Sequence, residues 1–312
     1  MVPPARKGPA AADARGQGPR CVSYHASAMV ISRRTFAAAA AAAPLSAKPF
    51  PKPLGVQLYT ARAVLAKDPD GVLERIAAIG YREVEFFGAD QFERWLPLTR
   101  KHGLAVTSTH LPIPFVTGDW GNQPSRDLDE FLDRVKLAGV SYAGLPFLAP
   151  KDRRNFPALC QKLNAVGEKC RAAGVQFFYH NHAFEFAGEP GARVIDVFAR
   201  ELDRQLVQLE LDIFWVSAAG VDPVAVLDEW KGSVALLHLK DKEPGMPVIT
   251  TESQARPSHF KEVGAGSLDM PQILAKAIAV GVDKFFVEQD QTPGDPVESL
   301  RISFENLRKI DV

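Results

Sequence analysis

The sequence predicts an α/β fold, a (β/α)8 barrel in one domain that follows an N-terminal leader. Eight short apolar segments after residue 50 alternate with eight amphipathic segments, several of which end at a glycine, the usual residue after a helix. His, Asp and Glu recur where the apolar segments end, and functional residues of barrels lie at the carboxyl ends of the strands. Eight such units over about 260 residues match the size of this barrel.

The elements follow one another without a linker or a low-complexity break. Strands are predicted at residues 54–59, 82–88, 104–112, 140–147, 174–182, 206–215, 234–241 and 283–290. Helices are predicted at about 69–79, 91–103, 126–139, 156–173, 193–202, 223–231, 270–281 and 296–309, and residues 242–269 form a long insert. The alternation favours parallel pairing with right-handed crossovers. A doubly wound open sheet is the alternative, but TARAVLAKD follows the first strand where that fold needs a glycine-rich turn.

Residues 1–50 are predicted to be a leader, and residues 51–312 the barrel. Residues 1–28 are rich in Pro, Gly, Ala and Arg, which indicates disorder or a start that precedes the true one, since Met29 opens a conventional leader. Ser32-Arg33-Arg34-Thr35-Phe36 resembles the twin-arginine export signal, and an alanine run follows it. That run is too short and too weakly apolar for a stable membrane anchor. We therefore expect a periplasmic protein.

Charge and cysteine content exclude several classes of protein. The chain has 37 basic and 37 acidic residues, so nothing in its net charge indicates a nucleic-acid partner. Cys160 and Cys170 share one predicted helix, about 15 Å apart, too far for a disulfide. The cysteine positions also exclude a cysteine-rich zinc site. The sequence is silent on oligomeric state and leaves a homo-oligomer open.

Alternation along the strands predicts which side chains face the barrel mouth. Charged groups in a barrel interior need partners, and one divalent cation with carboxylate and imidazole ligands satisfies several together. Asp212, His238 and Glu288 lie on consecutive predicted strands and are the best candidates; Mn, Mg, Co or a mixed-ligand Zn all fit. Each also has a structural interpretation: a helix cap for Asp212, a carbonyl-bonded core residue for His238, and an ion pair with Lys240 for Glu288. The complete inward set is Gln57, Tyr59, Glu85, Ser108, His110, His180, His182, Asp212, His238, Lys240, Glu288 and Asp290.

Six motifs together resemble the sugar phosphate isomerase/epimerase proteins of the xylose-isomerase-like TIM-barrel superfamily. They are GVQLYT, GYREVEFFG, YHNHAFEF, LELDIFWVSAAGVDPV, LLHLKD and FFVEQD, and the resemblance covers nearly all of residues 54–310. It implies one divalent ion held by Glu, Asp, His and Glu from strands five to eight, with the two glutamates exchanging protons with the substrate. By position, the last three ligands are Asp212, His238 and Glu288. His180 stands where the first glutamate is expected, so either His180 binds the metal or Glu185 reaches back to it.

This site predicts an isomerase or epimerase that acts on a sugar or keto-sugar. A metal chelated by a carbonyl and the adjacent hydroxyl acidifies the C–H bond between them and stabilises the resulting enediolate. Glu288 is the candidate base, with Glu185 or His180 as its counterpart. The same intermediate serves a lyase or dehydratase on a keto-sugar or keto-glycoside, and a sugar-binding barrel without catalysis also stays open. A metal-dependent endonuclease is disfavoured by the charge balance and the export signal.

Other polar and aromatic residues are candidates for substrate binding. Glu85, His110 and His182 are expected to line the mouth and bind sugar hydroxyls. Trp215 is expected to stack on a sugar ring. Lys240 is expected to hold a substrate oxygen, and Glu262, in the long insert, is expected to reach over the mouth.

Overall fold

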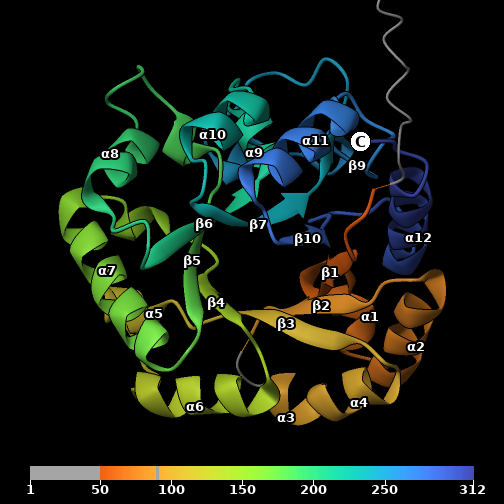
Figure 1. Cartoon of the computed structure of the whole chain (residues 1–312), viewed down its shortest axis with the longest axis horizontal. Helices are drawn as coiled ribbons and strands as arrows, with labels where there is room; N and C mark the ends of the chain where they lie inside the picture. The colour runs from red at the N-terminus through yellow and green to blue at the C-terminus, as the bar shows by residue number, and fades with distance from the viewer. Residues whose placement is uncertain (1–49, 89–90) are drawn as a thin grey trace, which may run out of the picture. The chain divides into compact units, whose positions relative to one another are not determined.

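The computed structural model describes residues 50–88 and 91–312, and eight parallel strands of this part close into a barrel (Figure 1). The predicted twin-arginine segment lies outside the described residues. The order around the barrel is β1-β10-β7-β6-β5-β4-β3-β2, which confirms the predicted (β/α)8 fold. The strands are β1 (Gly55–Gln57), β2 (Glu83–Phe86), β3 (Ala105–His110), β4 (Tyr142–Leu145), β5 (Gln176–His180), β6 (Val207–Asp212), β7 (Val234–Leu239) and β10 (Lys284–Val287).

Helices surround the strands, and local sequence signals set where several of them begin. Asp68, Asp222 and Asp295 each accept a hydrogen bond from a backbone N–H of the first turn, and each precedes a proline at the first helical position. The helices are α1 (Arg62–Leu65), α2 (Pro69–Ile79), α3 (Gln91–Arg94), α4 (Leu96–Lys101), α5 (Pro114–Thr117), α6 (Leu128–Ala138), α7 (Phe156–Ala172), α8 (Val194–Glu201), α9 (Ile213–Ala218), α10 (Pro223–Glu229), α11 (Met270–Val280) and α12 (Pro296–Leu307). Among the described residues, no helix combines the length and apolar composition needed to cross a bilayer.

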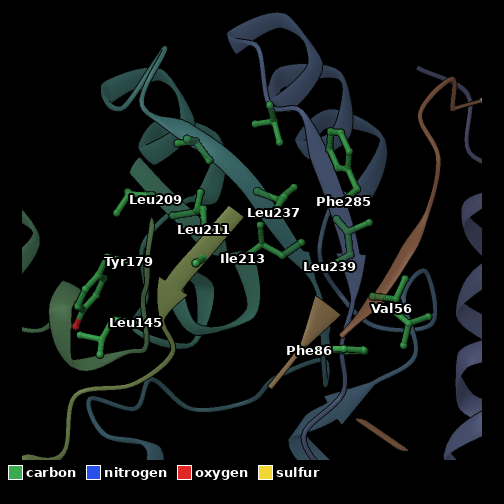
Figure 2. Close-up of a cluster of buried hydrophobic side chains, with 14 of the residues drawn as sticks. Val56, Phe86, Leu145, Tyr179, Leu209, Leu211, Ile213, Leu237, Leu239 and Phe285 are labelled. Carbon is green, nitrogen blue, oxygen red and sulfur yellow. The ribbon is translucent and has the colours of Figure 1, made fainter. Parts of the chain in front are cut away.

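The two faces of the strands pack into different layers. Outward-facing residues join the helices in the main hydrophobic core; Figure 2 labels Val56, Phe86, Leu145, Tyr179, Leu209, Leu211, Ile213, Leu237, Leu239 and Phe285 in it. Inside the barrel, Phe178, Leu236 and Phe286 form a separate buried cluster. The inward residues that follow each of these by two positions are polar: His180, His238 and Glu288. The period of two along a strand therefore places a polar layer directly above an apolar one.

Several segments differ from the sequence-based expectation, and three of them have a clear local cause or content. Strand six ends at Asp212 and not at Trp215, because Asp212 caps helix α9 and the chain turns helical at once. The amphipathic segment 91–103 divides into α3 and α4, and Pro97 in the first turn of α4 has no N–H to continue the helix of α3. The insert 242–269 contains an antiparallel pair, β8 (Asp241–Lys242) with β9 (Phe260–Lys261), and two short 3-10 helices, η4 (Glu252–Gln254) and η5 (Pro257–His259).

Candidate metal centre

Four buried side chains converge at the carboxyl ends of neighbouring strands. His180, Asp212 and His238 come from β5, β6 and β7, and Glu288 follows β10 directly. One ligand atom from each lies within 4.8 Å of the other three. His238 Nδ1 is 3.0 Å from His180 Nε2 and 3.1 Å from Glu288 Oε2. The structure thus brings together the three candidates that alternation identified, with His180 as the fourth.

The outer nitrogens of the two histidines fix where their protons lie. His180 Nδ1 is 3.0 Å from the carbonyl oxygen of Pro146, which can only accept, so Nδ1 carries the proton. His238 Nε2 lies 2.9 Å from Glu85 Oε1 and 3.1 Å from Glu210 Oε1, so this nitrogen donates to carboxylates. The inner nitrogens, His180 Nε2 and His238 Nδ1, face each other beside Glu288. Burial lowers the pKa of His238, but Glu210 and Glu288 outweigh it and raise the pKa well above its usual range, so a proton on Nδ1 fills this contact when no metal is bound, and a divalent cation would replace that proton. Metal-binding histidines are typically held in this way by a carbonyl or carboxylate on the other nitrogen.

Asp212 serves two purposes with its two oxygens. Its Oδ1 accepts a hydrogen bond of 3.1 Å from the backbone N–H of Trp215, so the predicted helix cap is present. Its Oδ2 has no hydrogen-bond partner among the described residues and lies 3.5 Å from His180 Nε2. Burial raises the pKa of Asp212, but Lys240 and His180 outweigh it and bring the pKa to about 2. This ionised oxygen also lies 3.0 Å from Lys240 Nζ, and it is of the type that binds a divalent cation.

Lys240 is the fixed cation of the site. Its Nζ lies 3.0 Å from Asp212 Oδ2, 2.7 Å from Glu288 Oε2 and in contact with Asp290. Burial raises the pKa of Glu288, but Lys240 and His238 reverse this and hold it well below its usual range. The ion pair proposed as an alternative for Glu288 therefore exists beside the cluster. The single ammonium group of Lys240 thus contacts three carboxylates, and carboxylate oxygens of this kind suit a divalent ion.

A second buried cluster lies against His238 from the opposite side. It contains Glu85, His110 and Glu210, with His110 Nε2 3.2 Å from Glu85 Oε1 and 3.3 Å from Glu210 Oε2. Burial lowers the pKa of His110, but the two carboxylates outweigh it and raise the pKa to about 9. Gln57 and Ser108 also donate hydrogen bonds to Glu85. This cluster pairs the His110 ring with two carboxylates and orients His238, while Glu210 Oε1 has no hydrogen-bond partner among the described residues.

Glu210 is the residue that the sequence analysis missed. It lies two positions before Asp212 on β6 and faces the same way, so the alternation that selected Asp212 also identifies it. The prediction considered only residues at the strand ends, and Glu210 lies one layer deeper in the barrel than Asp212. Glu85 is at the same depth: it is fully buried and contacts two histidines, and it is not among the residues that line the pocket.

A pocket of about 570 Å³ opens above the four-residue cluster. His110, His180, His182, Trp215 and Glu288 line it, while Lys240 lies below them and is fully buried. The remaining lining residues are Tyr59, Phe87, Pro146, Phe147, Glu252, Ala255, Pro257, Phe260, Asp290 and Gln291. A pocket of this size, walled by aromatic residues and with a charged floor, is typical of a small-molecule site.

Two further predicted site residues, Glu185 and Glu262, are also absent from the lining of this pocket and point elsewhere. Glu185 accepts hydrogen bonds of 2.7 Å from the Tyr179 hydroxyl and 2.9 Å from the His182 backbone N–H, which hold its carboxyl group on the far side of β5. Glu262 accepts a hydrogen bond of 2.8 Å from Ser299 on α12. The acidic residue that the long insert contributes to the pocket is instead Glu252.

Comparison with known proteins identifies the family. The family model of the xylose isomerase-like TIM barrel matches residues 73–310, and the chain belongs to this family. An inosose dehydratase from Clostridium botulinum is 26% identical over 151 residues, which cover 45% of this chain and 49% of that protein. The chain thus spans about half of that relative's length. An inosose dehydratase from Geobacillus kaustophilus is 22% identical over 270 residues, which cover 77% of this chain and 87% of the other.

Solved structures share the fold at low sequence identity. A sugar phosphate isomerase/epimerase from Parabacteroides distasonis has a TM-score of 0.65 and 24% identity, with 85% of this chain and 96% of that chain covered. The IolI protein with a bound zinc atom has a TM-score of 0.62 and 15% identity, covering 81% and 96%. D-psicose 3-epimerase from Clostridium cellulolyticum, solved with D-tagatose, has a TM-score of 0.56 and 14% identity, covering 82% and 96%.

Proposed function

We propose that this protein is a divalent-metal-dependent isomerase or epimerase of a sugar or keto-sugar. The observation that carries the proposal is the pair of inner nitrogens, His180 Nε2 and His238 Nδ1, 3.0 Å apart with their outer nitrogens already held. The oxygen of Asp212 that lacks a hydrogen bond within the described residues faces the same point. The zinc atom of the IolI protein and the epimerases among the structural neighbours support the assignment.

The residues around the pocket suit proton transfer beside a carbonyl. A bound divalent ion would supply Lewis acidity for a carbonyl oxygen and a neighbouring hydroxyl of the substrate. Glu288 lines the pocket and stays ionised. It is therefore the group that removes the proton from the hydroxyl-bearing carbon next to the carbonyl. Asp290 lines the pocket beside it and shares Lys240, and we assign it the return of the proton. Glu185 has no part in this assignment, because its carboxyl group is held behind β5.

A dehydratase is the second candidate, because both curated relatives compared above are inosose dehydratases. Such an enzyme removes the same proton and then expels a hydroxyl group from the next carbon as water. It needs no return of the proton to carbon. We also propose, from the Ser32–Phe36 segment of the sequence, that the protein works in the periplasm.

Metal analysis and deuterium exchange test the proposal together. We expect the purified protein to hold one divalent ion per chain by elemental mass spectrometry, and Asp212→Ala to lose it. In D₂O, NMR of candidate keto-sugars should show a rearranged sugar with deuterium at the carbon beside the carbonyl if the protein is an isomerase, or an unsaturated ketone formed by loss of water if it is a dehydratase.

Asp222→Ala, which removes a helix cap outside the pocket, is the matched control and should keep the metal. Stoichiometric metal in Asp212→Ala would show that the ion lies elsewhere. Metal-loaded protein that neither exchanges deuterium into a keto-sugar nor removes water from one would disprove the catalytic assignment.

A further inference from the structure

Aromatic side chains stand on two opposite sides of the pocket. Tyr59 and Phe87 follow β1 and β2, whereas His182 and Trp215 follow β5 and β6. In the closed strand order, β5 and β6 are three or four places away from β1 and β2, so the two pairs face each other across the mouth. The metal-ligand candidates come from β5, β6, β7 and β10. The Trp215 side follows the strands that carry His180 and Asp212, and we call it the near side. The Tyr59 side, called the far side, follows β1, which pairs with β10 and so borders Glu288.

The near side combines ring faces with unused polar atoms. The Trp215 and His182 rings lie 5.2 Å apart at 36°, and Phe147 meets His182 at 5.1 Å. Trp215 is 3% exposed, and its Nε1 has no hydrogen-bond partner among the described residues; His182 Nδ1 is in the same state. Trp95 and Trp230 also have indole nitrogens without a partner among the described residues, but only Trp215 lines the pocket, where its N–H can donate to a bound ligand. A sugar ring offers an apolar face and hydroxyl oxygens at its rim, which fits both features.

The far side is exposed but held in place. Tyr59 is 38% exposed, and it is one of three large hydrophobic residues that are exposed in the described part of the chain. Phe87 contacts its ring edge-to-face at 5.5 Å, and the Arg62 guanidinium lies 4.0 Å from the ring centroid. Arg62 itself donates to the carbonyl oxygens of Tyr59 and Asp290, at 2.9 Å and 3.0 Å. The Tyr59 ring is thus accessible and already held in one orientation. A ligand that stacks on it would therefore cause little further loss of side-chain conformational entropy.

We propose that the pocket binds a two-ring substrate, a glycoside, with one ring on each aromatic side. This inference rests on the proposed function, because the near ring is the one placed at the reacting centre. A single sugar ring on the Trp215 side would leave Tyr59 and Phe87 uncovered across the mouth. The pocket, at about 570 Å³, is of the size that encloses drug-sized ligands, which are larger than one sugar.

Calorimetric titration of the purified protein with unreactive glycosides tests the proposal. Methyl β-glucoside is the one-ring probe; phenyl β-glucoside and methyl β-cellobioside add an aromatic and a sugar ring, respectively. We expect at least one two-ring probe to bind about tenfold more tightly than methyl β-glucoside, the gain that one aromatic stacking contact gives. The stronger of the two identifies the chemistry of the second ring. Equal affinities for all three probes, or binding of none, would overturn the proposal.

The Tyr59→Ala variant locates the second ring. Because Tyr59 is partly exposed, its removal should leave the fold intact, and the ratio of two-ring to one-ring affinity should fall to about one. Leu137→Ala removes an exposed hydrophobic residue on α6, outside the pocket, and should keep the ratio. An unchanged ratio in Tyr59→Ala would contradict the assignment. None of the probes contains a ketone, so this measurement can fail while deuterium exchange succeeds, and the reverse.

Discussion

His110 lies between the carboxylates of Glu85 and Glu210 and forms the charged support of His238. Two buried acids on one imidazole favour its protonated form more strongly than burial disfavours it. An imidazolium at this position neutralises part of the acidic layer and shares Glu85 Oε1 with the Nε2 of His238, at 3.2 Å and 2.9 Å. The sequence predicts that His110 binds sugar hydroxyls at the barrel mouth. The structure shows that His110 also pairs with the buried carboxylates below the mouth.

His110 should titrate far above an ordinary histidine. We expect its ring proton in NMR to follow a pKa of about 9, and Glu210→Gln to lower that value. Because the folded-state pKa exceeds the unfolded value of 6.5, the stabilisation is complete below pH 6.5 and is lost as the pH rises through about 9. In urea unfolding, the free energy of unfolding should thus fall less between pH 6.5 and 9.5 in His110→Gln than in the original protein.

The exposed carboxylate of Glu201 gives a control, since Glu201→Gln should leave the titration of His110 unchanged. A pKa near 6.5 for His110 would show that the two carboxylates do not act on it in solution.

The long seventh loop is organised around one buried carboxylate. Asp241 is fully buried on β8, and its Oδ2 accepts hydrogen bonds from the backbone N–H groups of Gly264 and Gly266, at 2.9 Å and 3.1 Å. Its Oδ1 accepts from Lys242 N and Leu268 N, at 2.7 Å and 3.1 Å. Gly266 is required here, because an added Cβ would lie 2.2 Å from Asp241 Oδ1. This carboxylate joins the start of the loop to its end and so holds the segment that carries Phe260 into the pocket.

Asp241→Asn should destabilise the protein by about 3 kcal/mol, because an amide cannot accept all four hydrogen bonds and turns its NH₂ group toward backbone donors. Urea unfolding would measure the change. Asp222→Asn is a matched control, since asparagine caps a helix as well as aspartate does, and we expect a change below about 0.5 kcal/mol. Equal effects of the two substitutions would mean that Asp241 does not hold the loop.

Across the whole molecule, the sequence predicts the features that local periodicity determines, such as which face of a strand a side chain occupies. Alternation along a strand is a property of the backbone, so it placed Gln57, His180 and His238 on the inner face without knowledge of their neighbours. It also ranked Asp212 correctly as inward, although the strand was drawn three residues too long. The strand end escaped prediction because one residue, Asp212, is both the last of β6 and the cap of α9.

Loop residues were not predictable in this way, because tertiary contacts position them. Glu262 was expected over the mouth, but Ser299 on α12 holds it. Glu252 lines the pocket because Arg153, from the loop after β4, binds both of its oxygens at 3.0 Å. Both glutamates belong to the same insert, and no pattern within it distinguishes them. Their roles follow from partners that are distant in the sequence.

The apolar layer inside the barrel lies directly below the polar site residues and is expected to support them. A substitution at Gly144 tests whether the site depends on this layer. A Cβ at Gly144 would lie 2.2 Å from the Phe178 ring, two positions before His180 on the neighbouring strand. Gly144→Ala should therefore cost about 1–3 kcal/mol in urea unfolding, the usual result of overpacking a filled core. Because Phe178 can yield only by moving β5, the variant should also bind metal more weakly in a chelator competition.

Gly294→Ala is the control for this substitution, since its Cβ would meet no described atom within 4 Å. It should change neither stability nor metal affinity. If Gly144→Ala is destabilised but binds metal as tightly as the original protein, the polar layer does not depend on the apolar one, and His180 must be held by Pro146 alone. If both properties change together, the period of two that joins Phe178 to His180 is the physical link between the core and the site.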